Sequence, residues 1–117
     1  MRNKYLFIPD DTNITPFTSA EEAWFWYCLC QQLDPQQKKG GQSHIIRPCE
    51  SSDIFLAIKK LARAGLLQPQ HIKVLTKYGS QQTPPHPHFG DNLNICSLWQ
   101  EALRFLDSLL RRKGIVA

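Results

Sequence analysis

The residues most able to carry chemistry are four cysteines, four histidines and a group of lysines and glutamines in the second half of the chain. Cys28 and Cys30 are two positions apart. On a helix this spacing turns the side chains about 200° from one another, so they would not share one metal ion. The sequence has no C-x-x-C motif, and its remaining cysteines and histidines follow no zinc-binding spacing.

His86 and His88 are the other candidates for metal binding. In an extended chain both rings would face the same side, where Cys96 or His44 could come near. The alternative is an exposed loop that carries two histidines. We expect no metal and no cofactor, and the sequence leaves open whether this pair binds an ion.

Catalytic groups are not brought together by the sequence. Cys49 precedes an expected helix start, where a thiolate would be favoured, but no histidine is placed beside it. Adjacent Ser43 and His44 do not have the geometry of a catalytic triad. Gly40-Gly41 lacks the lysine and the preceding strand of a phosphate-binding loop. We therefore expect a protein that is not an enzyme.

The distribution of charge favours a polyanionic partner. Residues 1–53 carry five basic and seven acidic side chains, whereas residues 54–117 carry nine and three. Between Ile54 and Gly90 there are five basic side chains and no acidic one. One sign of charge across a helix pair is typical of nucleic-acid binding. The alternative is a solvated lysine face, which is common on helices.

These residues should be positioned by a single all-α domain, residues 1–117, with four helices and long loops. The first helix lies in "TPFTSAEEAWFWYCLCQQLDP", where Ser19 and Glu22 form a capping box and Pro35 ends the helix. Its run "WFWY" cannot face one core, because successive side chains step by about 100° around a helix. At least one aromatic should meet a second surface, and the candidates for a protein interface are Trp24, Phe25 and Trp26.

The second and third helices lie on either side of Gly65, which should end the second in the left-handed conformation. Ser51 or Ser52 should cap the second helix, with Asp53 in its first turn. Its expected buried stripe is Ile54, Ile58, Leu61 and Ala62. Pro69 suits the first turn of the third helix. This helix should end at Gly79, with an inner face of Ile72, Leu75 and Tyr78 or Val74.

The fourth helix should run from about Leu93 to Lys113, although Ser97 with Gln100 would allow a later start. Its expected apolar stripe is Ile95, Leu98, Ala102, Phe105 or Leu106, and Leu109, with Trp99 alongside. Before the first helix, residues 4–8 could add a strand, and residues 1–18 could form an extended arm. The longest apolar run, residues 23–30, is too short to cross a membrane. With no signal peptide visible, these features predict a cytoplasmic protein.

The stretch "LARAGLLQPQHIKVLTKYG", Leu61 to Gly79, resembles the helix-turn-helix superfamily of DNA-binding proteins. In this register Ala62 is the small residue where the two helices cross, and the apolar anchors are Leu61, Leu67, Ile72 and Leu75. The usual pattern has its glycine one step after the position of Gly65, so the match is partial. The resemblance covers residues 52–79 and implies a helix-turn-helix-like centre.

The resemblance implies a regulatory or sequence-nonspecific DNA-binding protein, acting as a homodimer or alone. Lys59, Lys60 and Arg63 would contact phosphates together with the cations that end the last helix, Arg111, Arg112 and Lys113. The residues that would face the bases are Gln68, Gln70, His71, Lys73, Thr76 and Lys77. The alternative function is a helical adaptor that binds another protein through its aromatic first helix and binds no nucleic acid.

Four further segments are similar to a set of small alphaproteobacterial proteins of unknown function. They are "RPCE", "RAGLL", "HIKVLTKYG" and "LWQEALRFLDSLLRRKGIV". The similarity extends from about residue 22 to the C-terminus. It implies a bacterial cytoplasmic setting and adds no chemistry.

Overall fold

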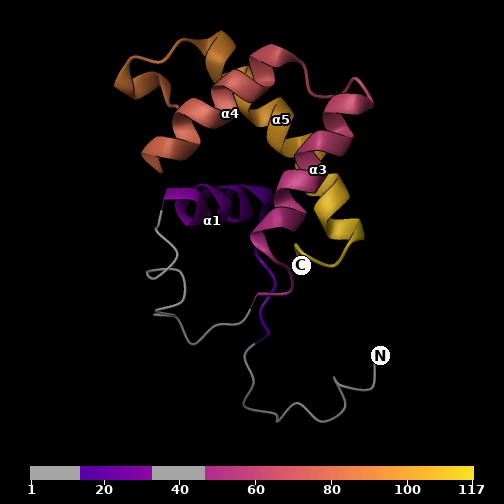
Figure 1. Ribbon diagram of the computed structural model, residues 1–117. Helices are drawn as coiled ribbons and strands as arrows, with labels where there is room; N and C mark the ends of the chain where they lie inside the picture. The colour runs from indigo at the N-terminus through magenta and orange to yellow at the C-terminus, as the bar shows by residue number, and fades with distance from the viewer. Residues whose placement is uncertain (1–13, 33–46) are drawn as a thin grey trace, which may run out of the picture.

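The computed structural model describes residues 14–32 and 47–117. They form four α-helices, α1 (Ala20–Gln32), α3 (Ser51–Arg63), α4 (Pro69–Gln81) and α5 (Leu93–Arg112), with a 3₁₀ helix, η2 (Pro87–Phe89) (Figure 1). No strand occurs in these two ranges, and the expected all-α fold of four helices is confirmed. The expected arm up to residue 13, the strand at residues 4–8 and the helix end at Pro35 lie outside the described residues. None of the helices described is long and apolar enough to span a membrane.

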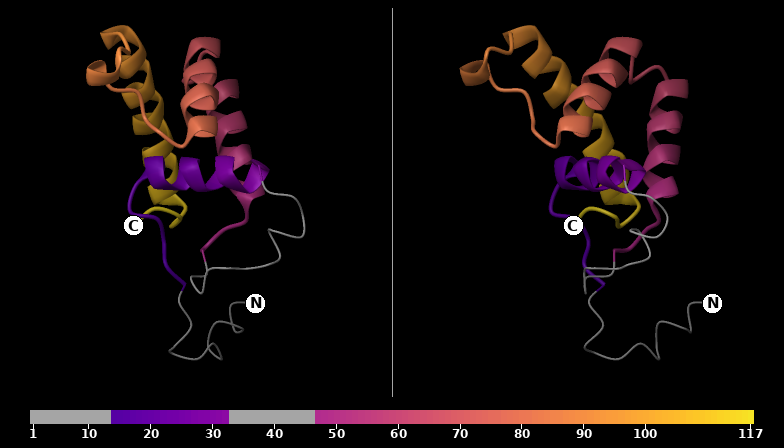
Figure 2. Two further views of the ribbon diagram at one scale, coloured as in Figure 1. Left: turned by 90° about the vertical axis from the view of Figure 1, so that its left-hand side faces the viewer. Right: turned by 60° about the vertical axis from the view of Figure 1, so that its left-hand side comes forward.

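The helices are arranged around a corner between α3 and α4. The two helices meet at residues 64–68 and spread apart below it, and α1 lies across their open ends (Figure 1). α5 runs behind this arrangement and stands to one side of it in the views of Figure 2. α4 packs mainly on α5 and α1, while α3 also packs on α1 and α5. α3 and α4 therefore make little contact with each other, although they are consecutive in the chain.

The core lies where α1, α4 and α5 meet and continues beneath α3. Its largest fully buried side chains are Phe17, Ile54, Leu75, Leu106 and Leu110. The segment before α1 pairs with the end of the chain: the Phe17 amide donates to the Ile115 carbonyl at 2.9 Å, and the Ala117 amide donates to the Phe17 carbonyl at 2.9 Å. These two hydrogen bonds thus hold the segment before α1 against residues 115–117.

The helix starts agree in part with the sequence pattern. Ser19 Oγ accepts from the Glu22 amide at 3.2 Å, but the Glu22 carboxylate accepts from the Thr18 amide, one residue earlier than a standard capping box. At α3 the capping residue is Glu50, not Ser51 or Ser52, and its amide donates to Asp53 Oδ2 at 2.8 Å. Asp53 is in the first turn, as expected.

The expected buried face of α3 is confirmed at Ile54 and Leu61, whereas Ile58 is only half-buried and Ala62 is wrong. Ala57 is buried, whereas Ala62 is exposed. Ile54, Ala57 and Leu61 point at the core, and Ala62 is turned about 100° from Leu61, past the edge of that stripe. The small residue expected to contact the next helix therefore contacts solvent.

The end of α4 differs from the expected one, whereas α5 begins at Leu93 as expected. α4 continues through Gly79 to Gln81, and Gln82 ends it with a left-handed φ of 56°. The Gln82 side-chain amide stabilises this end by donating to the Gly79 and Phe25 carbonyls, both at 2.9 Å. α5 begins at Leu93, because Asn92 caps it by accepting from the Ile95 amide at 2.8 Å, so the later start near Ser97 is wrong. Gly65, with φ of 81°, and Pro69 occupy the positions expected of them.

Candidate binding groove and basic helix face

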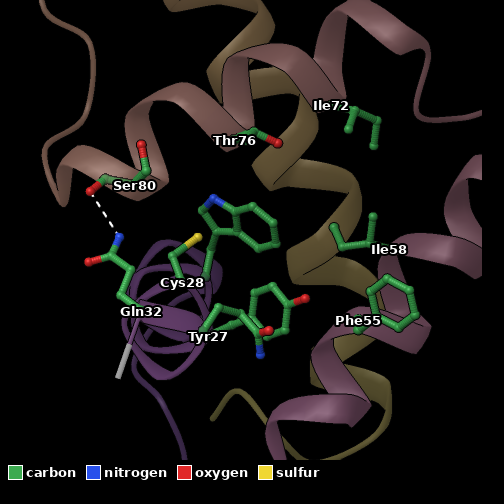
Figure 3. Close-up of a pocket in the computed structure, with 10 residues that line it drawn as sticks. Tyr27, Cys28, Gln32, Phe55, Ile58, Ile72, Thr76 and Ser80 are labelled. Atoms are coloured by element: carbon green, nitrogen blue, oxygen red, sulfur yellow. Dashed lines mark hydrogen bonds between the residues drawn. The ribbon is translucent and has the colours of Figure 1, made fainter. Parts of the chain in front are cut away.

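A groove of about 330 Å³ opens between α1, α3 and α4 (Figure 3). Helix α1 contributes Trp24, Tyr27, Cys28, Gln31 and Gln32, α3 contributes Phe55 and Ile58, and α4 contributes Ile72, Thr76 and Ser80. Ile58 and Ile72 point toward one another from the two diverging helices (Figure 3). Carbon-rich side chains form most of the wall, and Gln32 and Ser80 lie at the end near the C-termini of α1 and α4 (Figure 3).

Trp24 helps to keep the groove open. Its side chain inserts beneath α4, where the indole Nε1 donates to the Leu75 carbonyl at 2.9 Å. The ring stacks on Tyr27 with centroids 5.3 Å apart. This contact lets α4 rest on α1, so α4 does not fold back onto α3.

Gly79 makes the close approach of α4 to α1 possible. A Cβ atom at this position would lie 2.5 Å from Cys28 Sγ and 2.6 Å from Trp24 Nε1. These separations are shorter than non-bonded atoms allow, so with a larger residue the Cys28 thiol, the Trp24 ring or the two helices would have to shift. The sequence pattern predicts that Gly79 ends the helix. In the structure α4 continues past Gly79, and the absence of a side chain there lets α4 lie close to α1.

None of the ten side chains that line the groove is charged near neutral pH. Burial raises the pKa of the Cys28 thiol to about 11, and burial also raises the pKa of the Tyr27 hydroxyl. Both groups therefore remain protonated near neutral pH. Phe55 is 47% exposed at the edge of the groove, which leaves part of an aromatic ring in contact with water. Such a surface favours binding apolar groups over acid–base chemistry.

A second surface, the outer face of α4, carries most of the residues expected to read DNA. Gln70, Lys73, Thr76 and Lys77 are all exposed. Together with Pro69 and Ile72 they line a broad, shallow hollow that shares Ile72 and Thr76 with the groove. The residues expected to contact phosphates on α3 are exposed as well: Lys59, Lys60 and Arg63. None of the five cations forms a salt bridge with another described residue.

His71 does not belong to that surface. Its side chain is only 5% exposed, and Nδ1 accepts from the Gln68 amide at 2.9 Å. Nε2 lies 2.8 Å from Glu101 Oε1, which fixes the proton on Nε2 as donor. His71 therefore caps α4 and ties it to α5, and its expected contact with a base is wrong. Gln68 is exposed, but its side-chain amide donates to the Gly65 carbonyl at 2.9 Å and stabilises the turn.

The packing expected of a helix-turn-helix is not observed. Leu61, Leu67 and Leu75 are buried as anchors, but Ile72 lines the groove and Ala62 is exposed. Since α3 and α4 diverge, no small-residue contact holds them together. Only the turn resembles the helix-turn-helix motif. The packing of the two helices on either side of it differs.

The aromatic run of α1 is largely used inside the molecule. Trp24 is buried, Phe25 packs on Trp99 with ring centroids 5.7 Å apart, and Trp26 packs on Phe17 at 5.2 Å. The second surface expected for these rings is thus supplied by α5 and by the segment before α1. Among the three, only Trp24 lines the groove, together with its neighbour Tyr27, which sequence reasoning did not single out.

Phe55 and Ile58 were not expected at a binding surface either. The sequence feature that could have identified them is the run "IFLAI" at residues 54–58. This run carries more apolar residues than a single buried stripe requires. Phe55 and Leu56 are the two that remain exposed, 47% and 56% respectively. Of these two, only Phe55 lines the groove, and its exposed ring is apolar surface available to another molecule.

Of the other candidate residues, the structure describes His86, His88, Cys49 and Cys96, whereas Ser43 and His44 lie outside the described residues. His86 and His88 have ring centroids 5.1 Å apart, and His86 Nδ1 already accepts from the His88 amide at 3.0 Å. Within the described ranges no three potential ligands cluster as a metal ion requires. Burial, with smaller effects of Asp53 and Glu50, raises the pKa of the Cys49 thiol to about 11. The thiolate expected there is therefore disfavoured.

The described residues thus present two candidate surfaces, the groove and the outer face of α4. They meet along Ile72 and Thr76. One is apolar and recessed, and the other is basic and exposed. Comparison with protein families, curated proteins and solved structures finds no match for this chain.

Proposed function

We propose that this protein is an interaction module whose groove receives apolar side chains of a partner polypeptide. The observation that supports this function is the recess between α1, α3 and α4, whose wall includes Phe55, Ile58 and Ile72. Removing such carbon surface from water stabilises a complex by about 25 cal/mol for each Å² buried. Recesses that accept a few apolar anchors are a standard means of binding a peptide segment.

The polar groups around the groove suit binding better than catalysis. Gln31, Gln32, Thr76 and Ser80 can exchange hydrogen bonds with a bound chain, and Gln32 already donates to the Ser80 carbonyl at 3.0 Å (Figure 3). The Cys28 thiol is protonated near neutral pH, because its pKa is raised to about 11. A nucleophile activated by a neighbouring base would have the opposite shift.

A random peptide library displayed on phage and selected against the full chain tests this function. Phe55→Asp places a charge in the groove, and Leu56→Asp is its matched control because Leu56 is equally apolar, 56% exposed and absent from the groove wall. Selected peptides should bind the wild type and Leu56→Asp alike. They should lose about tenfold or more in affinity for Phe55→Asp, as expected at a binding hot spot. Peptides that bind both variants equally, or a selection with no enrichment, would reject the function.

DNA binding is the second candidate function, and a specific observation favours it. Gln70, Lys73, Thr76 and Lys77 lie exposed along α4, and amide and ammonium groups suit bases and phosphates. The exposed Ala62, the buried His71 and the separation of α3 from α4 count against a helix-turn-helix. Binding would then use the outer face of α4 alone, with support from the α3 cations.

Fluorescence anisotropy of a labelled duplex, measured over a range of salt concentrations, tests this second function. Lys73→Ala with Lys77→Ala should weaken binding and reduce the salt slope by about 2 if both contact phosphates. Arg104→Ala, at an exposed position of α5 that no expected DNA contact uses, removes one charge and is the matched control for each single lysine variant. Equal losses in Arg104→Ala and in the single lysine variants would indicate attraction by net charge only, and no binding by the wild type would exclude DNA.

A further inference from the structure

We propose that the occupant of the groove is an acidic amphipathic helix of the partner, an inference that rests on the proposed function. The juxtaposition behind it is an apolar recess with lysines on two of its edges and no carboxylate in its wall. Apolar residues on one side of the helix would fill the recess. Glutamate or aspartate on its flanks would face the lysines.

The lysines stand on opposite sides of the groove. On the α3 side, Lys59 is exposed and its Nζ lies 5.6 Å from the centroid of the Phe55 ring. On the α4 side, Lys73 lines the shallow hollow that shares Ile72 and Thr76 with the groove. A ligand seated between α3 and α4 would therefore lie between two ammonium groups.

Carboxylates near the groove would cancel this charge, but those of the described residues are placed elsewhere. Asp53 accepts from the Glu50 amide at the start of α3, and Glu22 pairs with Arg47 at 3.4 Å. Asp91 accepts from the Tyr78 hydroxyl at 2.6 Å, and Glu101 pairs with His71. The ten side chains that line the groove include no acid. Among the described residues, the charges at the edges of the recess are thus those of Lys59 and Lys73.

A helix fits this site better than an extended strand. The groove walls are three helices, whose backbone amides and carbonyls are satisfied internally. They offer no sheet edge to which a strand could add. A helical ligand satisfies its own backbone and presents apolar residues at i, i+3, i+4 and i+7, so it needs only side-chain contacts from the groove.

Two synthetic helical peptides of about 16 residues test the inference, a length that gives an i to i+7 anchor set with flanking turns. Both carry the same leucine face; one has glutamate and the other lysine at the flanking positions. Fluorescence anisotropy with the full chain should show the acidic peptide binding about tenfold more tightly at low salt. This preference should shrink at about 0.5 M salt, where charges are screened.

Variants of the full chain separate the contribution of the two lysines from that of the apolar recess. Lys59→Glu with Lys73→Glu should reverse the preference, so that the basic peptide binds more tightly. Lys60→Glu with Lys113→Glu makes the same change in net charge at exposed positions outside the groove and should preserve it. Phe55→Asp should weaken both peptides.

Each remaining outcome identifies which idea fails. If both peptides bind equally and both are lost in Phe55→Asp, the groove binds polypeptides but the acidic partner is wrong. If the acidic peptide binds Phe55→Asp as well as the wild type, it is held by charge outside the groove, and the inference is overturned. The inference is also overturned if neither synthetic peptide binds while peptides selected from the library do. Displacement of the acidic peptide by duplex DNA, with Phe55→Asp without effect, would assign the lysines to nucleic acid.

Discussion

The two sides of α4 show how differently one helix can be constrained. On its inner side, His71, Leu75, Tyr78 and Gly79 are buried, and each has a defined partner in α1, α5 or the loop after α4. On its outer side, a row of polar side chains contacts solvent: Gln70, Lys73, Thr76 and Lys77. Packing accounts for the residue types on the inner side. It does not account for those on the outer side, where residue choice is free to serve binding.

The groove lies at the border between these two sides. Ile72 is half-buried in its wall, and Thr76 belongs both to the groove and to the outer hollow. If the groove is a binding site, variants there should change affinity more than stability. Variants on the inner side should change stability, and variants on the outer side should leave it nearly unchanged. The following substitutions test that ordering.

The largest loss is expected for Trp24→Ala. The change removes a buried ring, its stacking on Tyr27 and the donor that reaches the Leu75 carbonyl. Loss of a buried aromatic side chain typically costs about 3–5 kcal/mol in the free energy of unfolding. Urea denaturation followed by circular dichroism measures it. Trp26→Ala, at a half-buried ring in the same helix, should cost less, and an equal loss would show that Trp24 has no special role in supporting α4.

Gly79→Ala comes next, and its sign distinguishes packing from helix propensity. Alanine in a helix is favoured over glycine by about 1 kcal/mol. Here the added Cβ would meet Cys28 Sγ at 2.5 Å, and overpacking typically costs about 1–3 kcal/mol. A net destabilisation is therefore expected in the same denaturation assay. Ser80→Ala, at the next and exposed position, is the control. Stabilisation by Gly79→Ala would mean that α4 and α1 are farther apart than described.

A smaller loss is expected for His71→Ala. The imidazole accepts from the Gln68 amide and donates to Glu101, so its removal leaves the Gln68 amide at the start of α4 without its acceptor. Loss of a helix cap costs about 1 kcal/mol. Thermal unfolding compared with that of Gln70→Ala, the exposed neighbour, isolates this contribution. Equal unfolding temperatures for the two variants would show that His71 does not stabilise the start of α4, and His71 would again be a candidate for binding.

The helices, the first-turn positions of Asp53 and Pro69, and the end of α3 at Gly65 could be predicted because their causes are local, although the residue that caps α3 is Glu50 and not Ser51 or Ser52. Capping residues and left-handed glycines act within a few positions of the chain. The separation of α3 from α4 could not be predicted in the same way. It depends on Trp24, far away in the sequence, inserting beneath α4, and on the missing side chain of Gly79.

The errors in the candidate site have the same origin. Ala57 and Ala62 are equally small, and only the direction from which α1 and α5 pack decides which one is buried. The helix-turn-helix register places His71 at the edge of the outward face, and only its contact with Glu101 on α5 shows that it faces inward. Outward-facing lysines were easier to predict, because charged side chains are rarely buried without a partner.

The smallest change in stability is expected for Lys73→Ala with Lys77→Ala. Lys77 lies 5.2 Å from the centroid of the Tyr78 ring, and neither lysine forms a salt bridge with another described residue. Exposed substitutions of this kind change the free energy of unfolding by no more than about 0.5 kcal/mol each. Denaturation curves should therefore overlay those of the wild type. A clear destabilisation would show that the outer side of α4 supports the fold after all, whereas unchanged stability with reduced binding would assign these lysines to a ligand.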